Sequence, residues 1–140
     1  MAQIDLHTRV LAVPAMNIQT ISSDTTTNGI IIDMLGYQAV EFVLTSGTIT
    51  TGVFTPLLQD GDDSGLSDAA NVSTDYLLGT YALATFTTAA ADDNACKQIG
   101  YVGKKRYVRL SIVTTSTGNG VISAQAIKGS PAIANIDALT

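Results

Sequence analysis

Hydrophobic and polar residues alternate along three stretches of the chain. In each stretch every second residue is apolar, and the residues between are mostly polar. The apolar positions are Val40, Phe42 and Leu44; Val108, Leu110 and Ile112; and Ile122, Ala124 and Ala126. A period of two residues is typical of strands in an antiparallel sheet that has one buried and one solvated face.

Short turn signals separate these stretches and divide the chain into regular, brief segments. In Thr117-Gly118-Asn119-Gly120 we expect a tight hairpin, because Gly and Asn adopt positive φ at little cost. A short helix around Ser67–Ala70, within segment 66–78, is the one helical element considered. The eight strands predicted are 5–13, 29–34, 38–46, 50–59, 76–88, 96–102, 106–114 and 120–128.

Regular short strands with such spacing indicate an all-β fold, an antiparallel β-sandwich or jelly roll. The 140 residues suit one domain, which we predict to span 1–140. Residues 1–20 are expected to form an N-terminal arm or first strand. Residues 131–140 are expected to form a C-terminal arm that orders only against a partner.

Composition excludes several classes of protein. A hydrophobic fraction of 46% with only 14% charged residues is incompatible with an acidic disordered chain. A net charge of −5 argues against a nucleic-acid binder, which needs a surplus of Lys and Arg. The first residues lack the apolar run of an export signal, and no stretch is long enough for a membrane helix. We therefore expect no membrane partner and synthesis in a cytoplasm.

Candidate catalytic residues are few. The chain has one histidine, His7, one cysteine, Cys96, and one glutamate, Glu41. Neither a nucleophile motif, a zinc-binding helix motif nor a phosphate loop is present in the sequence. We predict that the protein is not an enzyme, has no catalytic residues and needs no cofactor.

One loop has the spacing of a calcium site. Asp60, Asp62 and Ser64 occupy positions 1, 3 and 5 of such a loop, and Gly65 occupies position 6. Position 12 is Asn71 in place of the bidentate glutamate. The segment is at most a weak divalent-cation site, and a solvated loop between strands is the alternative that we favour.

Five of the seven basic residues lie close together in the sequence, interleaved with two tyrosines. The basic residues are Lys97, Lys104, Lys105, Arg106 and Arg109, and the tyrosines are Tyr101 and Tyr107. Three interpretations stay open: a structural role, such as pairing with the Asp-rich loop or protecting a sheet edge; contact with a protein partner; or contact with single-stranded nucleic acid. If a partner binds here, the contact residues are expected to be Lys104, Lys105, Arg106 and Arg109.

Several segments of the chain resemble one family of small β proteins encoded among phage head genes. The segments are Gly36–Leu44 with Thr48–Thr50, Pro56–Val72, Leu77–Thr80, Ile99–Leu110 and Ala126–Pro131. Together they extend over roughly residues 28–131, and they are similar to the capsid decoration (cement) and small head structural proteins of tailed bacteriophages. None of them is an active-site motif.

The resemblance implies a virion structural protein that binds the outer surface of a capsid and stabilises it. It implies the major capsid protein as partner, a homotrimer, and a place on the capsid surface. A head–tail connector or tail component is the alternative. A carbohydrate-binding module is a third possibility, weakened by the absence of tryptophan.

Overall fold

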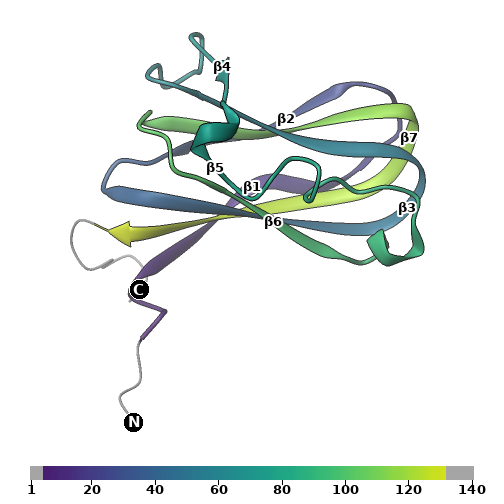
Figure 1. Cartoon of the computed structure of the whole chain (residues 1–140), viewed down its shortest axis with the longest axis horizontal. Coiled ribbons are helices and arrows are strands. Elements are labelled where there is room, and N and C mark those ends of the chain that lie inside the picture. The colour runs from purple at the N-terminus through teal and green to yellow at the C-terminus, as the bar shows by residue number, and fades with distance from the viewer. Residues whose placement is uncertain (1–4, 132–140) are drawn as a thin grey trace.

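A computed structural model describes residues 5–131, and β-strands dominate it (Figure 1). The strands are β1 (Val10–Ile21), β2 (Thr26–Asp33), β3 (Tyr37–Gly61), β4 (Ala70–Asn71), β5 (Leu77–Leu78), β6 (Cys96–Tyr101) and β7 (Tyr107–Pro131). Two three-residue 3₁₀ helices, η1 (Thr74–Tyr76) and η2 (Ala90–Asp92), interrupt them. Within residues 5–131 no helix is long and apolar enough to cross a membrane.

Two strands of 25 residues, β3 and β7, form the framework of the fold. They pair antiparallel over their whole length, from Tyr37 opposite Pro131 to Gly61 opposite Tyr107. The ribbon bends back on itself near its middle, so that its two halves lie in different layers (Figure 1). The predicted strands 38–46 and 50–59 are therefore one strand, and so are 106–114 and 120–128.

Each half of the β3–β7 ribbon pairs with different strands. In the first layer, β1 pairs with the second half of β7, and β6 pairs with the first half of β3 and carries β5 at its edge. In the second layer, β2 pairs with the first half of β7, and β4 pairs with the end of β3. The prediction of an all-β antiparallel sandwich is confirmed.

The expected hairpin at Thr117–Gly120 is wrong, because β7 continues through this segment. Ser116 and Thr117 do have positive φ values, of 63° and 57°, but they serve the bend of the ribbon. Asp24, between β1 and β2, accepts hydrogen bonds from the Thr117 and Gly118 amides at 3.1 and 2.9 Å. A bend in a paired ribbon needs residues with positive φ, as a hairpin does. The Gly and Asn residues of this segment therefore could not show which of the two forms.

Three other element predictions need correction. The first strand begins at Val10 rather than residue 5 and continues through Pro14 to Ile21; the proline is tolerated because β1 is an edge strand with a register shift after it. Segment 76–88 is mostly irregular, with only Leu77–Leu78 and one bridge, Phe54 to Phe86, in the sheet. Ser67 and Asp68 form a turn and Ala70 begins β4, so the helix expected there is absent; the one helical turn within segment 66–78 is η1. The arm expected at 131–140 lies, beyond Pro131, outside the described residues.

The core lies between the two layers. All nine apolar positions of the three alternating stretches are buried there, at 3% exposure or less. Phe54 and Phe86 fill the centre with them, both fully buried. The faces predicted for these three strands are thus confirmed.

Candidate functional site

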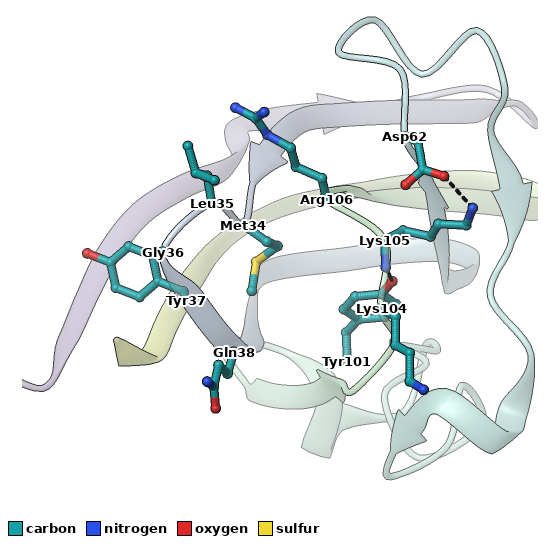
Figure 2. Close-up of a pocket in the computed structure, with 11 residues that line it drawn as sticks. Met34, Leu35, Gly36, Tyr37, Gln38, Asp62, Tyr101, Lys104, Lys105 and Arg106 are labelled. Carbon is teal, nitrogen blue, oxygen red and sulfur yellow. Dashed lines mark hydrogen bonds and ion pairs between the residues drawn. The ribbon is translucent and has the colours of Figure 1, made fainter. Parts of the chain in front are cut away.

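The loop end of the sandwich holds an open depression of about 460 Å³ (Figure 2). One wall is the β2–β3 turn with its flanks, Met34–Gln38, and the other is the β6–β7 turn, Gly103–Arg106. Asp62 and Tyr101 complete the lining. The start of β1 and the end of β7 lie at the same end, since Val10 pairs with Gly129. The lining thus includes residues of two groups predicted from the sequence: Lys104, Lys105 and Arg106 of the basic turn, and Asp62 of the Asp-rich loop.

Lys105 and Arg106 are each paired with a carboxylate. The Lys105 Nζ lies 2.5 Å from Asp62 Oδ2, on the side of the depression away from Met34–Gln38 (Figure 2). Arg106 binds Asp33 with two parallel hydrogen bonds, Nε to Oδ1 at 3.0 Å and Nη2 to Oδ2 at 2.9 Å. The hydrogen bond from Arg106 lowers the pKa of Asp33, and the hydrogen bond to Asp62 raises the pKa of Lys105. The Lys105–Asp62 contact matches the open interpretation in which the basic turn pairs with the Asp-rich loop, whereas Asp33 belongs to β2.

Lys104 and Arg109 have different surroundings from the paired residues. Lys104 is exposed and extends away from the Asp62–Lys105 pair, with no carboxylate partner among residues 5–131 (Figure 2). Arg109 lies in β7 and donates from Nη2 to Gln59 Oε1 at 2.7 Å. Lys105 and Arg106 are thus paired with carboxylates, whereas Lys104 and Arg109 have no carboxylate partner among residues 5–131.

The Asp-rich loop is held together by its own carboxylates. The Asp68 carboxylate accepts hydrogen bonds from the amides of Asp62 and Asp63, at 2.8 and 3.2 Å. The Asp63 carboxylate accepts from the amides of Gly65 and Ser67. These backbone hydrogen bonds are the main reason that the pKa values of both carboxyl groups are lowered.

The three predicted cation ligands do not converge on one point. Asp60 accepts a hydrogen bond from the Tyr101 hydroxyl at 2.7 Å, Asp62 pairs with Lys105, and Ser64 is exposed. Burial, reinforced by this hydrogen bond to Asp60, raises the pKa of Tyr101. Within residues 5–131 no three His, Cys, Asp or Glu side chains are grouped to hold a metal ion.

The three residues considered for catalysis lie on separate elements. His7 is exposed before β1, where its amide donates to Asp5 Oδ1 at 2.7 Å. Cys96 is exposed at the start of β6. Glu41 is in β3 with its side chain on the outer face of the first layer, where burial raises its pKa. Sequence reasoning gave Glu41 no role; the available signal was a single glutamate within an otherwise apolar strand.

Known proteins resemble this chain in structure but not in sequence. No protein-family model matches the chain, and no curated protein matches it. XepA, an exported protein of PBSX, superimposes with a TM-score of 0.54 at 11% identity, over 95% of this chain and 41% of XepA. This chain thus spans about two fifths of the length of XepA.

Two more distant likenesses are to a Bacillus endospore appendage and to YomS. The appendage structure, described as a disulfide-linked pilus, gives a TM-score of 0.49 at 12% identity over 89% of this chain and 90% of that one. The SPBc2 prophage-derived protein YomS gives 0.41 at 11% identity, over 86% and 93%. At such identities a likeness concerns the fold alone, and it is the XepA match that establishes it.

Proposed function

We propose that the chain is a bacteriophage structural protein that binds the outside of a capsid and stabilises the shell, as a decoration or cement protein. The observation that supports this is where the resembling segments lie in the fold. They form both ends of the bent β3–β7 ribbon, the Asp-rich loop, β5 and β6. The resemblance to phage head proteins therefore involves mainly the framework of the fold, which supports a structural role.

A cement protein acts by bridging shell subunits through many shallow contacts. The proposed partner is the major capsid protein, and the proposed state is a homotrimer, because linked copies multiply weak contacts through effective concentration. The start of β1 and the end of β7 lie at one end of the sandwich, because Val10 pairs with Gly129. Light scattering of the purified chain tests the trimer, and a monomer at micromolar concentration contradicts a preformed one.

The role is tested by adding the purified protein to particles that lack it. We expect the protein to co-sediment with the particles and to raise the temperature at which they rupture. A protein without affinity for the capsid, such as serum albumin, serves as the control. If the shells neither bind the protein nor gain heat resistance, the cement role is wrong, and a head–tail connector or tail component becomes the better proposal.

A further inference from the structure

The outer faces of the two layers differ in how their polar side chains are paired. On the second layer, outward side chains bind one another across the strands. Ser111 donates to Asn28 at 2.9 Å, and Gln59 accepts from Arg109 and donates to Asn71 at 3.2 Å. Such a ladder satisfies polar groups within the face, where Ser111 is fully buried.

The outer face of the first layer combines apolar and polar rows, and the exposed Gln125 and Gln98 lie opposite Val43 in one of them. One row of paired residues crosses all five of its strands: Ala12 opposite Ile127, Ile127 opposite Glu41, Glu41 opposite Gly100, and Gly100 opposite Leu78. Leu78 is 58% exposed. We call the surface formed by Ala12, Ile127, Glu41, Gly100, Leu78 and Val43 the Glu41 face.

Glu41 is the one charged residue of this row, and its carboxylate has no hydrogen-bond or ion-pair partner among residues 5–131. It lies over Gly100, where a Cβ would come within 2.6 Å of Glu41 Oε2 and 3.0 Å of Leu78 Cβ. A half-buried carboxylate without a compensating donor is unfavourable for the isolated chain. A bound cation or donor from outside would compensate it.

We propose that the Glu41 face docks onto an apolar patch of the shell protein that presents a lysine or arginine to Glu41. This inference rests on the proposed function and assigns its contact surface. Five strands about 4.8 Å apart and three residues of about 3.3 Å along each, the stretch from Glu41 to Val43, make a face of roughly 240 Å². That is less than half of one partner's share in a standard interface, about 800 Å², so stable attachment needs more than one copy or contact.

Charge favours a foreign partner over a second copy of this chain. A two-fold symmetric contact through the Glu41 face would bring the same surface of both copies together, and with it the two Glu41 carboxylates. Two copies would also each bring a net charge of −5. A partner surface with a cation opposite Glu41 avoids both repulsions.

A pair of matched lysine substitutions tests the proposal. Val43→Lys puts a long charged side chain on the Glu41 face, and Val113→Lys does the same at a half-buried outward valine of the second layer. Measured by co-sedimentation with undecorated particles, Val43→Lys should weaken binding at least tenfold and Val113→Lys should leave it unchanged. Glu41→Gln, which keeps the shape of the side chain, should weaken binding several-fold and reduce its dependence on salt.

The possible failures are distinguishable. If the wild-type protein does not bind particles, the proposed function is wrong. If wild type binds and the folded Val43→Lys and Glu41→Gln variants bind equally well, the function stands and the Glu41 face is not the contact surface. If Val43→Lys instead lowers the oligomeric state in light scattering and spares particle binding, a second copy covers the face and the proposed partner is wrong.

Discussion

Most carboxylates of the protein stabilise its own loops. Asp92 is an example: it is nearly buried, yet it accepts hydrogen bonds from the Thr87 amide at 2.7 Å and pairs with the Lys97 Nζ at 2.8 Å. Burial alone would raise the pKa of Asp92, but the hydrogen bonds from Lys97 and Thr87 leave it lowered. Glu41 has burial without such compensation, and its pKa is raised.

We predict that Glu41→Gln stabilises the isolated protein at neutral pH. Because the folded-state pKa of Glu41 lies above its ordinary value of 4.5, folding favours the protonated form, and wild-type stability falls as the pH rises through that range. The gain from the neutral glutamine should therefore be present at pH 7 and vanish near pH 3. Thermal unfolding of both proteins across this range measures it.

A variant that is less stable than wild type at pH 7 would contradict this assignment. So would a difference in melting temperature that stays constant from pH 3 to pH 7. Either result would mean that Glu41 makes a favourable contact within the isolated chain.

At the scale of elements, the bend of the β3–β7 ribbon decides the fold. The two backbones pack closely where the ribbon turns: Gly52 has a φ of +91°, and a Cβ there would come within 2.3 Å of the Gly118 Cα. Register shifts between Ser46 and Val53 on β3 accompany the bend. Bulges of this kind increase the local twist and let one pair of strands pass from one layer to the other.

Gly52→Ala is therefore expected to destabilise the protein strongly. Gly36→Ala is the matched control, because Gly36 also has a positive φ, +84°, but nothing lies within 4 Å of its missing Cβ. The control should lower the free energy of unfolding by about 1 to 2 kcal/mol, the cost of left-handed backbone for alanine. Gly52→Ala should cost this and several kcal/mol more for the backbone clash.

Denaturant unfolding of the two variants measures the difference. Equal losses of stability for Gly52→Ala and Gly36→Ala would show that the close approach of the two strands at the bend is not required.

The Asp-rich loop should not depend on a divalent cation. Its carboxylates already accept backbone hydrogen bonds or bind Lys105 and Tyr101. Treating the protein with a chelator should leave its melting temperature unchanged. A fall of several degrees would indicate that Asp60, Asp62 and Ser64 bind a cation, because a ligand that binds only the folded state stabilises that state.

The alternating stretches were predictable because burial of one strand face requires a period of two. The fusion of predicted strands into β3 and β7 was not, since the Gly and Asn residues near 47–52 and 116–120 have the same backbone preferences in a bend and in a hairpin. Segment 76–88 is rich in apolar and threonine residues like a strand. Its shape is instead fixed by side-chain contacts, such as the Tyr81 hydroxyl between the Leu58 amide and the Val72 carbonyl.

At the scale of the whole molecule, the important property is the Glu41 face, where Glu41 has no ion-pair partner among residues 5–131. Alternation in the sequence separates inward from outward residues, but it does not show which outward residues become neighbours. Ala12, Glu41, Leu78 and Ile127 are far apart in the sequence and meet only through strand pairing. The basic turn was visible in the sequence, whereas the pairing of Lys105 with Asp62 and of Arg106 with Asp33 required the fold.

The copy number of the chain in purified particles tests the central claim most directly. Quantitative mass spectrometry against the major capsid protein measures it. A decoration protein covers the whole shell, so we predict a copy number comparable to that of the major capsid protein. Absence from the particles, or only enough copies for one ring at the portal or tail, would contradict the account.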